Sequence, residues 1–140
     1  MLTNQECEAM NSFKKDTLMA ALGMTFVPTD DDCAVVEMLI STATRQHMGI
    51  VHGGAYLALA ETAAGAGSLH VAGMDAKVCG IQVSGNHVMM SPTEGKVIGY
   101  ATLVSAGHTI HVWNVDVKDE GGNVLSTARV VNRVQIENKE

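Results

Sequence analysis

The chain has 140 residues, of which 46% are hydrophobic, and this is enough for one globular domain with an apolar core. Nine basic and fifteen acidic side chains give a net charge of −6, which argues against nucleic acid or an anionic membrane as a partner. The N-terminal residues are acidic where a signal peptide is basic, and no apolar run approaches the roughly 20 residues that span a bilayer. We therefore expect a cytoplasmic protein that spans no membrane.

Metal-binding and cysteine patterns are weak in this sequence. The three cysteines have no close spacing, so neither a disulfide framework nor a cysteine-rich zinc site is predicted. His47 and His52 lie five positions apart in a loop, while His108 and His111 would point to opposite faces of a strand. We expect no metal and no organic cofactor.

Taken in chain order, the sequence predicts two helical and six strand segments. The first twenty-odd residues are predicted to form one helix that Gly23 closes as a C-cap. The runs "MTFVP" and "CAVVEMLIS" follow around the acidic turn "TDDD", which indicates a hairpin. After Gly54, a stretch rich in Ala and free of Pro predicts the one long helix, of about 15 to 20 residues.

Four strand-like runs with alternating apolar positions follow Gly73, and "DEGGN" is predicted as the turn between the last two. Three of these runs carry stripes of mainly apolar or aromatic residues on a single face: Ile98, Tyr100, Thr102 and Val104 in the first, Trp113, Val115 and Val117 in the second, and Val124, Ala128, Val130, Val134 and Ile136 in the third. The order helix, two strands, long helix, four strands indicates an α+β fold with an antiparallel sheet. A helix of small residues favours a strongly curved sheet wrapped around it, and a bare outer sheet face favours an oligomer.

Glu61 stands alone as a charged residue within the long helix. No Lys or Arg occurs between Arg45 and Lys77, so Glu61 has no cation nearby in the sequence. A solvent-facing position is the ordinary explanation for a glutamate. However, Gly54 lies seven positions earlier on the same helix face, where free amides at the helix start can bind an anion or a developing oxyanion. We therefore consider Glu61 a candidate catalytic acid or base.

Further polar groups stand just before the long helix. Gln46, His47 and His52 supply amide and imidazole groups that can polarise a carbonyl. Together, Gln46, the tripeptide His52-Gly53-Gly54 and Glu61 form a pattern that resembles the hotdog-fold acyl-CoA thioesterases, in the branch of the 4-hydroxybenzoyl-CoA, 1,4-dihydroxy-2-naphthoyl-CoA and phenylacetate-pathway enzymes. The resemblance extends from about Leu22 to Val134 and includes "NHV", "EGKVIG" and "HVWNVDVKDEGGNVLSTARV".

The resemblance implies one hotdog domain over residues 1–140, with a curved antiparallel sheet around one long helix. It implies a homodimer with active sites at the interface, and often a homotetramer. By position, Glu61 is the nucleophile or general base, and the backbone N–H of Gly53 is the oxyanion donor. Gln46 and His52 hold the carbonyl, facing a Glu61 from the other subunit.

Contacts with CoA and substrate are implied for eleven more residues: Gly65, Ser68, Gly80, His87, Val88, Met89, Met90, Ser105, Gly107, His108 and Thr109. One departure from the family pattern is Gly65, which stands where many relatives have Ser or Thr. We expect an acyl-CoA thioesterase that acts on an aromatic or small acyl group. An acyl-carrier-protein thioesterase and a non-catalytic acyl-CoA-binding domain are the alternatives.

Overall fold

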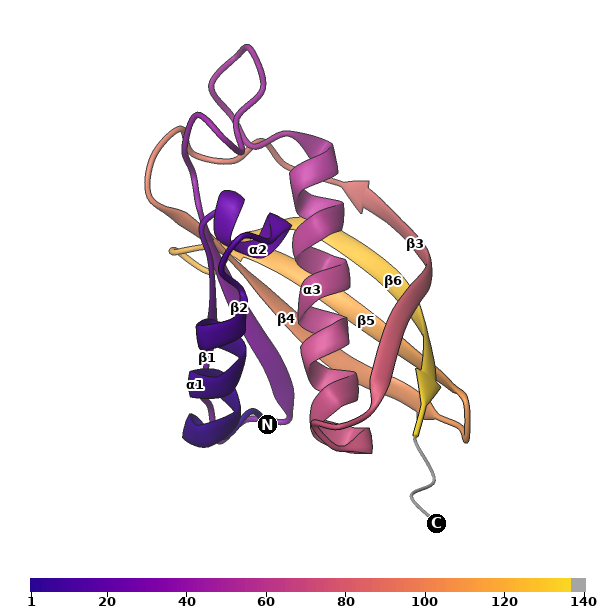
Figure 1. Cartoon of the computed structure of the whole chain (residues 1–140). Coiled ribbons are helices and arrows are strands. Elements are labelled where there is room, and N and C mark those ends of the chain that lie inside the picture. Colours follow the sequence, from indigo (N-terminus) through magenta and orange to yellow (C-terminus); the bar gives the residue numbers. More distant parts are fainter. Residues whose placement is uncertain (137–140) are drawn as a thin grey trace.

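The structure, a computed structural model, describes residues 1–136 and contains three helices and six strands in that part of the chain (Figure 1). In order they are α1 (Asn4–Phe13), α2 (Leu18–Ala21), β1 (Met24–Val27), β2 (Cys33–Leu39), α3 (Gly53–Ala72), β3 (Lys77–His87), β4 (Lys96–Ala106), β5 (Ile110–Asp119) and β6 (Val124–Gln135). No helix in residues 1–136 has the length and apolar character needed to cross a bilayer.

The prediction of one continuous N-terminal helix was wrong. α1 ends at Phe13, and the chain turns before α2 begins at Leu18. Asp16 in this turn has a φ of 62°, a left-handed conformation that interrupts helical hydrogen bonding. Thr3 and Glu6 begin α1 with reciprocal side-chain to backbone hydrogen bonds.

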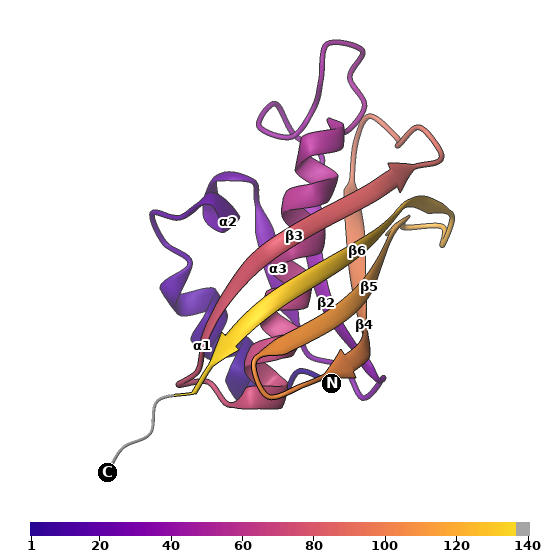
Figure 2. The same ribbon diagram turned by 90° about the vertical axis from the view of Figure 1, so that its right-hand side faces the viewer.

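The six strands form one antiparallel sheet in the order β1-β2-β4-β5-β6-β3, as predicted for an α+β fold. Figures 1 and 2 show this sheet curving around α3, with α1 and α2 beside the helix. β3 forms one edge of the sheet with eleven residues, and β1 forms the other with four. A long open edge therefore lies on the β3 side.

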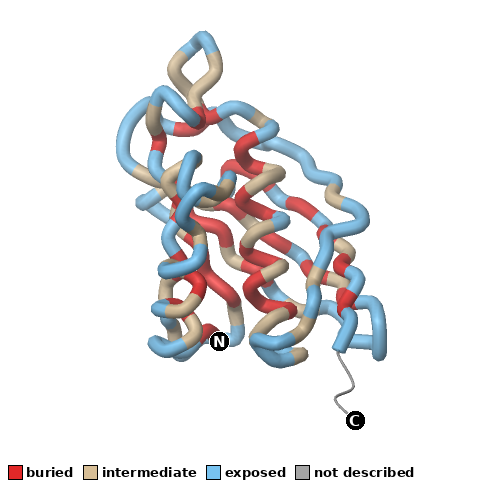
Figure 3. Tube along the Cα trace, in the orientation of Figure 1, coloured by how far each residue is buried: buried red, intermediate tan, exposed pale blue. Residues whose placement is uncertain are grey.

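Small residues let α3 approach the sheet closely. A Cβ on Gly67 would lie 2.4 Å from Cη2 of Trp113, so only glycine leaves room for the indole. On the sheet, Gly99 in turn makes room for Leu59, whose Cγ would lie 3.2 Å from an added Cβ. The buried residues concentrate between α3 and the inner sheet face (Figure 3). The expected reason for the Ala and Gly content of this helix is therefore confirmed.

From Ile98 to Thr102 the predicted stripe on β4 shares one face, and that face points away from α3, because Leu59 and Ala63 of α3 lie over Gly99 on the opposite face. At Val104 a bulge interrupts the alternation, and this side chain is 50% exposed. On the outward face, the ammonium group of Lys118 in β5 lies 5.1 Å from the ring centroid of Tyr100 and makes a cation–π contact with it. The alternation of residues in the sequence predicted which side chains share a face of β4, but it did not identify which face of the strand packs against α3.

Candidate active site

The start of α3 presents one backbone amide without a partner. His52 is the N-cap, and its Nδ1 accepts a 2.8 Å hydrogen bond from the Gly54 N–H. The expectation that the Gly54 amide is free was therefore wrong. The Gly53 N–H has no hydrogen-bond partner within residues 1–136. Because Nδ1 of His52 accepts, the neutral ring carries its hydrogen on Nε2 and can donate from there.

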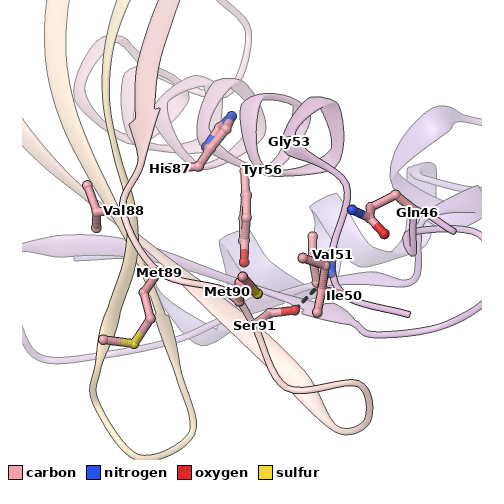
Figure 4. A pocket seen from close by; sticks show the side chains of 10 residues that line it. All are labelled: Gln46, Ile50, Val51, Gly53, Tyr56, His87, Val88, Met89, Met90 and Ser91. Carbon is pink, nitrogen blue, oxygen red and sulfur yellow. Dashed lines mark hydrogen bonds between the residues drawn. The ribbon is translucent and has the colours of Figure 1, made fainter. Parts of the chain in front are cut away.

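A pocket of about 410 Å³ opens beside Gly53 (Figure 4). Its lining residues are Gln46, Ile50, Val51, Gly53, Tyr56, His87, Val88, Met89, Met90 and Ser91. The Oε1 atom of Gln46 accepts a hydrogen bond from the Met48 N–H, so the side-chain NH₂ remains available as a donor. The pocket thus combines amide donors with an apolar wall.

His87 packs directly against the start of α3. A Cβ on Gly53 would lie 2.8 Å from both Cδ2 and Nε2 of His87, so this position accepts only glycine without movement of the ring. Nδ1 of His87 is 2.9 Å from the Ser126 hydroxyl, and the ring lies 5.2 Å from that of Tyr56. These contacts hold the imidazole beside the unpaired Gly53 amide.

Sequence reasoning missed Tyr56 in this pocket. Its hydroxyl is buried without a hydrogen-bond partner in the described chain, and Figure 4 shows it pointing towards Met90 and Ser91. Burial raises the pKa of Tyr56, so the hydroxyl keeps its proton and can donate. The available signal was the spacing of Gly53 and Tyr56, which places both on one helix face.

Glu61 lies in a second hollow, about two turns further along α3. Its carboxylate rests over Gly80 of β3, where an added Cβ would lie 2.6 Å from both Cδ and Oε1. In the single chain Glu61 is exposed, and it makes no hydrogen bond or ion pair with residues 1–136. The carboxylate therefore lies close to a strand and has no cationic partner within residues 1–136.

The hollow beside Glu61 is an apolar cavity of about 230 Å³. α1 and α2 contribute Met10, Phe13 and Met19 to its wall, and none of these was predicted as a site residue. Gly65 also lines it and has nothing within 4 Å of an added Cβ, so the missing side chain leaves open space. The apolar spacing of α1 was visible in the sequence, but its position against Glu61 was not.

The predicted catalytic residues do not converge within one chain. Gln46 and Gly53 line the first pocket, Glu61 lines the second, and His52 lines a third of about 280 Å³ beside Arg45. Helical rise separates Gly53 from Glu61 by about 12 Å along the axis of α3. Residues 1–136 contain no group of three or more His, Cys, Asp or Glu side chains arranged to hold a metal ion.

Several predicted contact residues lie away from these pockets. Ser68 is fully buried, and its hydroxyl is hydrogen-bonded to the side chains of His111, Trp113 and Asn132. It therefore cannot contact a substrate directly. Four further predicted contact residues lie in and beside the hairpin that joins β4 to β5: Ser105, Gly107, His108 and Thr109. This hairpin is at the end of the sheet opposite the first pocket (Figure 1). Within one chain they do not reach Gly53.

A model of the thioesterase superfamily matches residues 48–126. The chain is 31% identical to the 1,4-dihydroxy-2-naphthoyl-CoA hydrolase of Escherichia coli over 91% of this chain and 93% of that protein. It is also 31% identical to the proofreading thioesterase EntH of Cronobacter turicensis, covering 91% and 92%. A thioesterase structure from Haemophilus influenzae superposes with a TM-score of 0.87 at 26% identity, covering 96% of this chain and 94% of that one. A structure of a Pseudomonas aeruginosa thioesterase with one glutamine replaced by alanine gives a TM-score of 0.86 at 27% identity, covering 92% and 93%.

Proposed function

The chain belongs to the thioesterase superfamily and is a thioester hydrolase with the hotdog fold, and we propose that it hydrolyses an acyl-CoA through Glu61 and the Gly53 amide. The observation that carries the proposal is the Glu61 carboxylate, which lies over Gly80 without any polar partner in the described chain and borders an apolar cavity. The Escherichia coli relative, which is named as a hydrolase of a CoA thioester, supports CoA as the leaving group.

Helix geometry favours an active site shared by two chains. A reacting carbonyl has to lie within about 3 to 3.5 Å of the attacking atom and near its oxyanion donor at the same time. Gly53 and Glu61 of one α3 are separated by about 12 Å along the axis, which is too far for one carbonyl group. A Glu61 from one protomer and a Gly53 from another are not bound by this separation, so two protomers packed together could bring both groups to one carbonyl.

The β3 edge is the surface through which two copies would associate. It is an eleven-residue outer strand, and it carries the exposed Ile81 and the Gly80 that underlies Glu61. Long apolar edge strands are templates for pairing with another chain. Antiparallel pairing of two β3 strands would extend the sheet and bring each Glu61 towards the other protomer.

Hydrolysis then follows from the groups in this shared site. The Gly53 N–H, with the Gln46 amide from the same pocket as an additional donor, stabilises the oxyanion that develops on the thioester carbonyl, while His52 holds the start of α3 through its bond to the Gly54 N–H. Glu61 either removes a proton from water as the water oxygen adds to the carbonyl carbon, or adds its own oxygen to form an anhydride that water later cleaves. In both routes the C–S bond breaks and CoA leaves as a thiolate. The thiolate takes up the proton that Glu61 removed from water in the first route, and a proton from the solvent in the second.

An acyl-CoA panel tests the activity directly. Aromatic, short aliphatic and long aliphatic acyl-CoAs are incubated with the enzyme, and released thiol is measured. Glu61→Gln should lower kcat by about 100-fold to 10,000-fold, as expected for the loss of a general base. Glu8→Gln, which changes an exposed glutamate on α1, is the matched control and should retain full activity. Equal rates for Glu61→Gln and the wild type would refute the role of Glu61.

Mixing two inactive variants tests whether the site is shared. Glu61→Ala and Gln46→Ala are co-expressed with different tags, so that heterodimers form. If Glu61 of one chain acts with Gln46 of the other, each heterodimer regains one intact site, and about a quarter of the wild-type activity returns. If both residues act within one chain, no activity returns.

A further inference from the structure

The segment before α3, which carries Gln46, contains a backbone amide that the segment itself cannot pair. Arg45 and Val51 face each other across an isolated antiparallel bridge. The hydrogen bonds of this bridge are made by the residues beside the pair, such as the 2.9 Å bond from the Gln46 N–H to the Ile50 carbonyl. The Val51 N–H therefore points away from the bridge. Because Val51 is only 4% exposed, its amide needs an acceptor from elsewhere in the fold.

Ser91 supplies this acceptor from the segment that follows β3. Its Oγ accepts a 2.8 Å hydrogen bond from the Val51 N–H across 40 positions of sequence, and Figure 4 shows this bond as a dashed line. The same hydroxyl donates to the Pro92 carbonyl at 2.7 Å, which turns its lone pairs towards Val51. Ser91 is buried as well, so water does not compete for the bond.

The turn that presents the Gln46 amide has few other restraints. Figure 1 shows the segment between β2 and α3 projecting from the end of the fold at which α3 begins, and residues 47–48 within it are exposed. A second link to the segment after β3 runs from Nη1 of Arg45 to the Thr93 carbonyl, but it is 3.2 Å long and exposed. Water competes with such a bond, so the buried bond to Ser91 is the stronger link.

We propose that Ser91 is a positioning residue, which through Val51 holds the Gln46 amide where this amide donates to the thioester oxyanion. The role rests on the proposed thioesterase function and is exerted through Gln46 rather than on the substrate. Without the hydroxyl the Val51 N–H would be buried and unpaired, so the turn should shift until this amide meets water. The Gln46 donor then leaves its position as well.

The displacement should be visible in kcat rather than in KM. A shift of about 1 Å in a positioned group can cost about 100-fold in rate, and oxyanion donors act mainly in the transition state. We therefore expect Ser91→Ala to lower kcat by about 10-fold to 100-fold and to leave KM nearly unchanged. An unchanged kcat, or a loss carried by KM alone, would overturn the assignment.

A double-mutant cycle tests whether Ser91 acts through Gln46. Thiol release is measured for the wild type, Ser91→Ala, Gln46→Ala and the double variant, at enzyme concentrations high enough to follow the slow forms. Ser91→Ala should lower kcat strongly in the wild-type background and only slightly in the Gln46→Ala background, because the donor that it displaces is then absent. An equal fold-loss in both backgrounds would overturn the assignment.

Ser68→Ala is the matched control, because it also removes a fully buried hydroxyl, but one that bonds to core side chains away from Gln46. It should lower the melting temperature and retain the wild-type kcat. A loss of kcat as large as that of Ser91→Ala would show that general destabilisation explains both. If Ser91→Ala does not fold, Ser91→Cys, which keeps the side-chain volume but offers only a weak acceptor, is measured in the same way.

Amide hydrogen exchange reports on the turn without reference to activity. Peptides that cover residues 45–52 should exchange faster in Ser91→Ala than in the wild type, whereas peptides from the second half of α3 should not change. Unchanged exchange in residues 45–52 would overturn the assignment. Absence of thiol release by the wild type from every acyl-CoA would instead refute the proposed function, and the exchange measurement would still show whether Ser91 holds the turn.

Discussion

Replacing Gly80 with alanine should place a methyl group against the Glu61 carboxylate. The added Cβ would lie 2.6 Å from both Cδ and Oε1 of Glu61, whereas non-bonded carbon atoms are in favourable contact at about 3.5 to 4.0 Å. The carboxylate therefore has to move by roughly 1 Å, and a displacement of that size can cost about 100-fold in rate. We expect kcat for acyl-CoA hydrolysis to fall about 100-fold.

The fold should tolerate this substitution, because the atoms that must move end a flexible side chain. A rotamer adjustment of Glu61 costs about 0.5 to 1.5 kcal/mol at most, so the melting temperature should change by only a few degrees. Gly121→Ala makes the same chemical change in a distant turn, where the added Cβ would be in ordinary contact with Asp119 at 3.4 Å, and it should keep full activity.

A double substitution separates displacement of Glu61 from general damage. Asp is one methylene shorter than Glu, so the combination of Glu61→Asp with Gly80→Ala should be less impaired than the product of the two single effects. Thiol release and thermal melting are measured for all four forms. Full activity in Gly80→Ala, or strictly multiplicative effects in the double variant, would refute the reasoning that Gly80 positions the carboxylate.

Three further outcomes are expected from the packing and from a shifted pKa. Gly67→Ala would bring a Cβ to 2.4 Å from the Trp113 ring and should lower the free energy of unfolding by about 1 to 3 kcal/mol. Urea denaturation measures this change, and an unchanged midpoint would contradict the close approach of α3 to the sheet. Gly53→Ala retains the backbone N–H but forces His87 aside, so kcat/KM should fall by about 10-fold or more while cooperative thermal unfolding persists; wild-type kcat/KM would show that the ring position is unimportant. Burial lowers the pKa of His111 below its ordinary value of 6.5, so as the pH falls this histidine takes up a proton in the unfolded chain before it does so in the folded one. The contribution of His111 to the free energy of unfolding should therefore be complete above pH 6.5 and decline below it. Urea denaturation at a series of pH values should show a smaller decline for His111→Gln.

Local patterns were sufficient for most of the secondary structure. The Ala-rich stretch after Gly54 became the 20-residue helix α3, and the "DEGGN" turn joins β5 to β6 as predicted. The break between α1 and α2 could not be predicted in the same way. It depends on Asp16, a non-glycine residue in the left-handed region, and the sequence around it contains no glycine or proline to indicate a turn.

The candidate site was only partly accessible from the sequence. Gln46 and Glu61 were selected by residue type and spacing, whereas Gly53 was selected through the resemblance to hotdog-fold thioesterases. The family that the comparisons establish makes their chemistry consistent with hydrolysis of a thioester. The approach of the Glu61 carboxylate to Gly80 could not be found in that way, because Gly80 lies on β3, 19 positions later in the chain. No local pattern encodes such a contact.

The sequence by itself determined most of the elements, the small-residue helix and the solitary glutamate, because these depend on residue type and on periods of two or 3.6 residues. The tertiary structure alone decided which strand face meets α3, which amide at the helix start remains unpaired, and what surrounds Glu61. Those properties follow from the sheet order β1-β2-β4-β5-β6-β3 and from the approach of α1, which bring together groups far apart in the chain. Burial and hydrogen-bond saturation are properties of the packed molecule, so they emerge only when all its neighbours are in place.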